Sequence, residues 1–321
     1  MYHAINKGYK ITEMTQNGGV EARVFNVFAR ALNLVTKEGQ LVGILNYQHQ
    51  GPNNIIVPGL DNSANFIRAG QYALITPELI SVPEANFFVN IDNVNVWPKP
   101  ILPKSPLANM EERQRSVLMA VETTLGLGKD HGFAILLPHL LSKGGGDLGN
   151  NTKPNSILED SVKGSTITHA LTCLGLLRKS LVETCPFEKM EKAVQGLVGL
   201  GRGLTPQGDD FLTGFILTFI YYSRAINIQS QWVLALTRKV VEAAENRTTK
   251  VSEHQIRDAA NGEADETTSK AAISMLWGME CLKKRIIDLT HQGSSSGSDL
   301  ITGICLASEW LHYLTKPRGT I

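Results

Sequence analysis

The stretch GDDFLTGF at residues 208–215 recurs as GSDLITGI at residues 297–304. Both copies contain a glycine, an aspartate two positions later, two apolar residues, a threonine and a second glycine. Each copy follows a loop of small, flexible residues and begins an apolar helix. The duplication therefore predicts two related units in which a loop leads into a helix.

Apolar residues in both expected helices recur every three or four positions, which is typical of one continuous buried face. Gly214 and Gly303 lie inside these helices, where each costs about 1 kcal/mol relative to alanine. Close packing of one helix on the other would account for both glycines. We therefore predict two central helices packed in pseudo-symmetry. The spaced residues are Phe211, Phe215, Phe219 and Tyr222 in one helix, and Leu300, Ile304, Ala307, Leu311 and Leu314 in the other.

The rest of the chain changes character at the proline-rich segment WPKPILPKSP, residues 97–106. Before it, turn signals every eight to twelve residues predict strands; after it, helical periodicity prevails. The fold class expected is α+β: a β-rich domain at 1–105 and a mostly α-helical domain at 106–321. The 141–160 stretch, rich in Gly, Asn and Pro, is expected to be a long loop. Strands are predicted at 24–28, 31–36, 41–46, 54–57, 72–76 and 87–97, and helices near 107–125, 162–184, 187–199, 210–225, 230–245, 251–260, 265–287 and 299–314.

Composition excludes several classes of protein. The 321 residues include 31 Lys and Arg against 30 Asp and Glu, so no bulk positive charge favours nucleic acid or an anionic membrane. No apolar run approaches the roughly 20 residues of a membrane helix, and the N-terminal stretch does not resemble a signal peptide. These features predict a cytoplasmic protein. The four cysteines lack metal-ligand spacing and are expected to be buried thiols.

The two loop-to-helix units predict a binding site. If the helices run in the same direction, their N-termini meet and present unsatisfied N–H groups with partial positive charge, which attract an anion. Glycines would let the backbone approach a small anionic substrate, hydroxyls would donate hydrogen bonds, and an arginine would supply a bidentate fork. The candidate binding residues are Arg202, Gly203, Thr205, Gly208, Ser296, Gly297 and Ser298.

The aspartates of the repeat suit two further roles. Asp210 and Asp299 are positioned to cap the first helical turn, which is common. Alternatively Asp209, Asp210 and Asp299, with Thr205, would bind Mg²⁺ through oxygen ligands. The residues alone do not choose between an anion and a cation, and neither loop is a Walker A or dinucleotide motif.

A third element follows at residues 247–252, between two expected helices. Its pattern alone favours a helix end followed by an N-cap at Thr249 or Ser252. His131, His139 and His169 have no serine or cysteine partner in a recognisable nucleophile motif, and we assign them no role.

The segment GLGRGLTPQGDDFLTGF at 199–215 resembles the AllH-like bacterial family, which is linked to an oxamate carbamoyltransferase. The similarity continues in ALNL at 31–34, GPN at 51–53, the Thr249 to Gly262 segment and SGSDLITG at 296–303. Arg202 departs from the pattern, because proline is expected there in many relatives.

The resemblance implies phosphorolysis of oxalurate to oxamate and carbamoyl phosphate during allantoin breakdown, in an assembly with other subunits. Paired helix N-termini with Arg202 or Arg247, Thr249 and Ser252 would bind the anions. Asp209, Asp210 and Asp299 would be the catalytic set, with Asp210 positioning substrate N–H groups or assisting proton transfer to the leaving nitrogen.

Two other classes stay open. The chain could be a non-catalytic subunit that only binds a ligand, or a Mg²⁺-dependent hydrolase of a small phosphorylated or N-linked substrate. No other cofactor is expected. The oligomeric state is left open, a homo-oligomer included.

Overall fold

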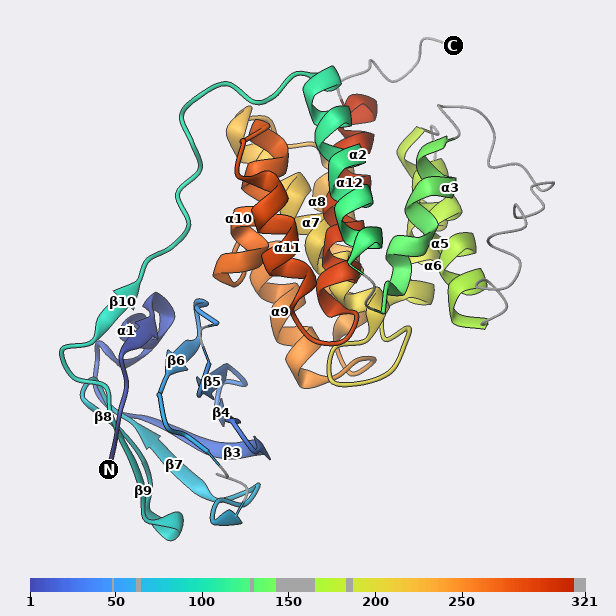
Figure 1. Ribbon diagram of the computed structural model, residues 1–321. Helices are drawn as coiled ribbons and strands as arrows, with labels where there is room; N and C mark the ends of the chain where they lie inside the picture. Colours follow the sequence, from blue (N-terminus) through green and yellow to red (C-terminus); the bar gives the residue numbers. More distant parts are fainter. Residues whose placement is uncertain (48, 62–64, 128–129, 143–164, 183–186, 315–321) are drawn as a thin grey trace. The chain divides into compact units, whose positions relative to one another are not determined.

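The computed structural model describes residues 1–47, 49–61, 65–127, 130–142, 165–182 and 187–314 (Figure 1). Contacts divide the chain into two units, which are described separately. Met1–Ile101 and Glu263–Thr267 form the first unit, and Leu102–Gly262 and Thr268–Ile321 form the second. The domain boundary expected near residue 105 stays a prediction, and most of the 141–160 loop lies outside the described residues.

The first unit is built on one ten-stranded sheet, a half-barrel of order β1-β9-β8-β7-β3-β4-β5-β6-β2-β10. Buried apolar side chains from alternate strand positions, among them Leu32, Leu34, Val42 and Ile44, form its core. The elements are β1 (Tyr2–His3), β2 (Asn6–Gly8), α1 (Tyr9–Thr15), β3 (Val20–Phe28), β4 (Ala31–Thr36), β5 (Leu41–Leu45), β6 (Asn54–Ile56), β7 (Tyr72–Ile75), β8 (Leu79–Val82), η2 (Pro83–Ala85), β9 (Phe87–Asn90) and β10 (Asn95–Trp97).

The single strand predicted at 87–97 is wrong, because a turn separates β9 from β10. The Asn90 side chain accepts a hydrogen bond from the Asp92 N–H at 2.9 Å, and Asn93 has a φ of 53°. Asparagine and aspartate stabilise such turns through local hydrogen bonds and tolerate the left-handed conformation. The two halves then pair with different strands, β9 with β1 and β8, and β10 with β2.

Glu263 attaches its own segment, residues 263–267, to the first unit. Its buried carboxylate pairs with the ammonium groups of Lys10 at 2.6 Å and Lys99 at 3.0 Å. Burial opposes ionisation, but hydrogen bonds from the two lysines and Tyr9 outweigh it and lower the pKa of Glu263. After residue 262 the chain thus returns briefly to the first unit.

The second unit is helical, so the fold is the mixed α+β class that the sequence predicts. Among the described residues, no helix combines the length and apolar character needed to cross a membrane. The elements are α2 (Met110–Gly126), η3 (Gly132–Leu136), α3 (Leu137–Ser142), α5 (Ser165–Val182), α6 (Phe187–Leu197), α7 (Gln207–Ala225), α8 (Gln231–Ala244), α9 (Lys250–Ala260), α10 (Glu266–Trp277), α11 (Leu282–Thr290) and α12 (Ser296–Leu314).

The continuous helix predicted at 265–287 is also wrong. Gly278, with a φ of 60°, follows the last residue of α10, and α11 begins only at Leu282. A glycine in the left-handed conformation is a common way to end a helix. Periodicity alone does not reveal this end, because the apolar spacing continues across the break.

The two repeated helices, α7 and α12, lie side by side in the middle of the helical unit (Figure 1). A Cβ atom on Gly214 would lie 3.1 Å from the carbonyl carbon of Leu300, and one on Gly303 would lie 2.7 Å from the backbone nitrogen of Phe215. Each glycine therefore lets the backbone of the other helix approach. The predicted close packing of two central helices is confirmed.

Candidate functional site

The N-terminal ends of α7 and α12 meet, so the two helices run in the same direction. Thr205, just before α7, and Ser296, the first residue of α12, share a hydrogen bond of 2.9 Å between their hydroxyls. Both aspartates that the repeat places at helical position four are buried at this end, with Asp210 3% exposed and Asp299 fully buried. The aspartates and hydroxyls of both copies thus gather in one place.

The repeat extends backward into the loops. Before α7, the N–H of Gly208 donates to the carbonyl of Leu200 at 2.9 Å. A Cβ on Gly208 would lie 2.9 Å from the carbonyl carbon of Leu197, at the end of α6. Glycine is required there because the backbone at the start of α7 lies in close contact with the end of α6.

The loop before α12 repeats this geometry with fewer residues. The N–H of Gly297 donates to the carbonyl of Gln292 at 3.1 Å, and a Cβ on Gly297 would lie 2.7 Å from the carbonyl carbon of Leu289. The N–H groups of Gly208 and Gly297 already have acceptors, so these two are not among the unsatisfied donors expected at the helix ends. An anion bound here would have to be held mainly by side chains.

Asp209 connects three segments of the helical unit. One carboxylate oxygen accepts the N–H of Gly199 at 2.8 Å, and the other accepts the hydroxyl of Thr248. Burial raises the pKa of Asp209, and hydrogen bonds from Thr248, Gly199 and Ser252 oppose that shift. These contacts hold the loop before α7 against the start of α9, and a catalytic role for Asp209 stays a prediction.

Asp210 is less completely satisfied. Its Oδ2 atom is buried and has no hydrogen-bond partner among the described residues. Burial holds the pKa of Asp210 well above its usual range; the hydroxyls of Ser296 and Thr205 oppose this shift, and nearby Asp299 adds to it. This setting favours the protonated form of the Asp210 carboxyl over the ionised form.

Asp299 lies at the equivalent place on α12. Its Oδ1 accepts the N–H of Phe133 at 2.6 Å, while its Oδ2 is buried without a partner in the described part of the chain. Burial raises the pKa of Asp299 to about 8, against the hydrogen bond from Phe133. Beside it, the Ser298 hydroxyl donates to the carbonyl of Asp130 at 3.4 Å.

The third predicted element packs against the loop before α7. Thr249 is the N-cap of α9, as its pattern predicts, and accepts the N–H of Ser252 at 3.1 Å. The Thr249 hydroxyl also donates to the carbonyl of Leu204 at 2.5 Å, and the Ser252 hydroxyl approaches the same carbonyl at 3.5 Å. Thr249 and Ser252 therefore position the loop.

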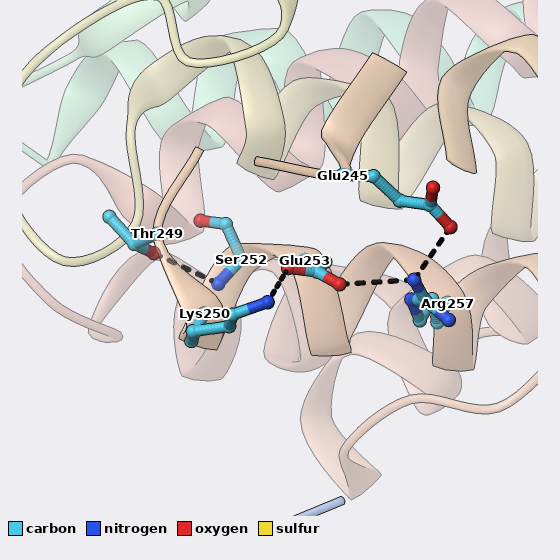
Figure 2. Close-up of polar contacts among 6 residues, drawn as sticks. All are labelled: Glu245, Thr249, Lys250, Ser252, Glu253 and Arg257. Atoms are coloured by element: carbon cyan, nitrogen blue, oxygen red, sulfur yellow. Dashed lines mark hydrogen bonds and ion pairs between the residues drawn. The ribbon is translucent and has the colours of Figure 1, made fainter. Parts of the chain in front are cut away.

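Figure 2 shows the ion pairs that fix the start of α9. Buried Glu253 accepts from Lys250 at 2.7 Å and from Arg257 at 3.0 Å, and Arg257 also contacts Glu245 at 2.8 Å. Glu253 is a positioning residue that the sequence analysis missed. The signal was available, because Lys250, Glu253 and Arg257 have the spacing of helical ion pairs.

The arginines expected to bind anions lie on the surface. Arg247 is exposed and donates to the carbonyl of Gln195 at 3.0 Å. Arg202 is exposed and has no partner among the residues that the structure describes. Next to it, Gly203 has a φ of 97°, and a Cβ there would meet no atom of the described residues within 4 Å. This part of the loop is open.

The carboxylates expected to hold Mg²⁺ are not grouped as a metal site in the described part of the chain. Within the described ranges, no three His, Cys, Asp or Glu side chains are grouped so that they could hold a metal ion. Asp209 faces Gly199 and Thr248, whereas the partnerless oxygens belong to Asp210 and Asp299.

Comparison with known families gives two matches. Residues 197–308 match the model described as oxamate carbamoyltransferase subunit AllH, and residues 4–96 match the AllH family N-terminal domain. Together the matches cover most of the chain and include both copies of the repeat. No solved structure matches the chain.

Proposed function

Because the chain belongs to the AllH family, we propose that it is a subunit of an oxamate carbamoyltransferase whose small anionic ligand binds at the joined N-terminal ends of α7 and α12. In the reaction proposed, an oxygen of inorganic phosphate bonds to the ureido carbonyl carbon of oxalurate. The bond from that carbon to the oxamate nitrogen breaks, and the nitrogen takes a proton. The products are carbamoyl phosphate and oxamate.

The observation that supports this proposal most strongly is the pair of partnerless oxygens, Asp210 Oδ2 and Asp299 Oδ2. Leaving a buried polar atom unpaired costs about 1–3 kcal/mol, so native proteins seldom do it without a reason. A ligand with N–H and oxygen groups, such as a ureido or amide compound, would satisfy both.

Asp210 is the residue we propose as the proton donor to the leaving nitrogen. A general acid must be protonated at the working pH and must lose its proton in the transition state. Burial favours the protonated form of Asp210 and raises its pKa, and the hydroxyls of Ser296 and Thr205 would stabilise the carboxylate left after proton transfer. Asp299 would then bind and orient the substrate.

The anionic groups of the substrates would be bound by different atoms. Arg202 is exposed and unpartnered within the described residues, next to the open backbone at Gly203. A guanidinium can bind a phosphate or carboxylate with two hydrogen bonds. The hydroxyls of Thr205 and Ser296 are further donors, and the partial charge of the two helix ends favours negative ligands.

The test compares Asp210→Asn with Asp209→Asn and, as a surface control, Asp288→Asn. Turnover of oxalurate and phosphate is measured with the purified chain alone and together with its partner subunits. We expect Asp210→Asn to lower turnover about 100-fold or more while the protein stays folded. Unchanged turnover in that variant would refute the assignment of Asp210.

Ligand binding separates this proposal from the alternatives. Thermal unfolding is followed with phosphate, carbamoyl phosphate, oxamate, oxalurate and Mg²⁺, because a ligand of the folded state raises the melting temperature. Stabilisation by oxamate or carbamoyl phosphate that disappears in an Asp210→Asn, Asp299→Asn double variant supports the site. Stabilisation by Mg²⁺ alone, with turnover lost in chelator, would favour the hydrolase. Binding without any effect of Asp210→Asn on assembly turnover would indicate a ligand-binding subunit.

A further inference from the structure

Residues 130–133, DHGF, form a short segment that lies directly against the start of α12. The N–H of Phe133 donates to Asp299 at 2.6 Å, and the carbonyl of Asp130 accepts the Ser298 hydroxyl at 3.4 Å. The Asp130 side chain closes the turn by accepting the N–H of Gly132 at 3.2 Å. Both the first and the last residue of the segment therefore contact the start of α12.

Gly132 shows how closely this segment approaches the carboxyl of Asp299. It has a φ of 49°, and a Cβ added there would lie 2.7 Å from the carboxyl carbon of Asp299 and closer still to Oδ1. No side chain fits between the segment and Asp299. The residue before Gly132, His131, is held at this end of the helical unit by the same contacts.

Like the two aspartates, His131 has a buried side-chain atom without a hydrogen-bond partner among the described residues. It is half-buried, and its Nδ1 atom is buried with no hydrogen-bond partner among the described residues. Asp210 Oδ2 and Asp299 Oδ2 are also buried without partners there. Buried polar atoms are nearly always paired, and the backbone next to His131 lies against Asp299, so these partnerless atoms are consistent with a missing ligand at the start of α12.

We propose that His131 is a ligand-binding residue of this site and that its Nδ1 forms a hydrogen bond with the bound molecule. The inference rests on the proposed function in placing a ligand at the ends of α7 and α12. An imidazole nitrogen can accept from an N–H group or donate to an oxygen, depending on its tautomer, so it suits a small ligand that carries both amide and carboxylate groups. This role needs no nucleophile beside His131.

The binding test uses two substitutions with different chemistry. In His131→Asn a polar atom stays near the position of Nδ1, whereas His131→Leu removes it. His312→Asn is the matched control, because His312 lies near the other end of α12 and its Nδ1 contacts the Glu309 carbonyl at 2.7 Å. Affinities of the full chain for oxamate, oxalurate and carbamoyl phosphate are measured by calorimetry. We expect His131→Leu to weaken binding at least tenfold, and both His131→Asn and His312→Asn to stay within threefold of the wild type. Wild-type affinity in His131→Leu would overturn the inference even if Asp210→Asn abolishes binding.

A second measurement needs no ligand and so separates this inference from the proposed function. The imidazole ¹⁵N signals of His131, identified by their loss in His131→Asn, report its tautomer and hydrogen bonding. We expect them to move in Asp299→Asn and to stay in place in Asp288→Asn. Unchanged signals in Asp299→Asn would show that His131 does not share the environment of Asp299, and the inference would then be wrong whatever the protein binds.

Discussion

Replacing Gly303 with alanine tests whether close contact between α7 and α12 holds the site together. The added Cβ would lie 2.7 Å from the backbone nitrogen of Phe215 and still closer to the carbonyl oxygen of Phe211. Both are backbone atoms of a buried helix, so neither can rotate away. To restore an ordinary contact of 3.4 Å to the nitrogen alone, the helices must separate by at least about 0.7 Å.

Two opposing effects set the magnitude. Forcing an extra carbon into a well-packed core costs about 1–3 kcal/mol, and backbone contacts belong at the upper end of that range. Alanine gains about 1 kcal/mol over glycine in helix propensity. We therefore expect Gly303→Ala to lower the free energy of unfolding by about 1–2 kcal/mol, because the steric term exceeds the propensity term.

Gly175 provides the matched control. It also lies inside a helix, α5, but a Cβ there would meet no atom within 4 Å in the part of the chain that the structure describes. Gly175→Ala should therefore stabilise the protein by up to about 1 kcal/mol. Urea unfolding followed by tryptophan fluorescence measures both variants, since Trp232 and Trp310 are buried in the helical unit.

A double variant tests whether the two glycines act at the same interface. Gly214→Ala strains the same interface from the other helix, so once one alanine has separated the helices the second should cost less than it does alone. If Gly303→Ala were as stable as Gly175→Ala, the contact between α7 and α12 would not be under steric control. Simple addition of the two costs would also contradict a shared interface.

Three further variants test the charged groups. Because burial raises the pKa of Asp299 from 3.8 to about 8, the folded state keeps a proton that the unfolded state loses, so the free energy of unfolding should fall as pH rises between these values. Asp299→Asn has no such proton, so its free energy of unfolding relative to wild type should increase steadily from about pH 5 to 8. Asp209→Asn should lower the free energy of unfolding by about 1–3 kcal/mol, since an amide nitrogen cannot accept from Gly199 or Thr248; equal urea midpoints would count against this. Glu263→Gln should destabilise the first unit by about 1.5–3 kcal/mol at neutral pH. The pKa of Glu263 is lowered, so this difference should vanish only in acid, as wild-type Glu263 itself becomes protonated.

The sequence predicts the elements that have a repeated or periodic pattern. The glycines of the two copies indicated the contact between α7 and α12, because a glycine inside an apolar helix needs a packing reason. Periodicity placed most strands and helices as well. The predictions failed at 87–97 and 265–287, where one left-handed residue, Asn93 or Gly278, interrupts an otherwise suitable pattern.

The partners of the candidate site are harder to predict, because they come from far along the chain. Phe133 contacts Asp299 through its backbone N–H, which has no sequence signature. Gly132 and His131 likewise look ordinary until the fold places them against α12. The acceptors of the Gly208 and Gly297 N–H groups were hidden for a related reason, since the loop carbonyls that accept from them cannot be identified without the fold.

The two copies of the repeat share their packing but differ at the helix end where we propose the site. The packing glycines and the loop hydrogen bonds recur in both, whereas Asp209 in one copy corresponds to Ser298 in the other, and the loop before α7 is longer than the loop before α12. Asp209 binds Gly199 and Thr248, while Ser298 binds Asp130. Two identical ends would suit a symmetric ligand or two equal groups. Two different ends instead suit two unlike groups brought together, as the proposed reaction between phosphate and a ureido acid would require.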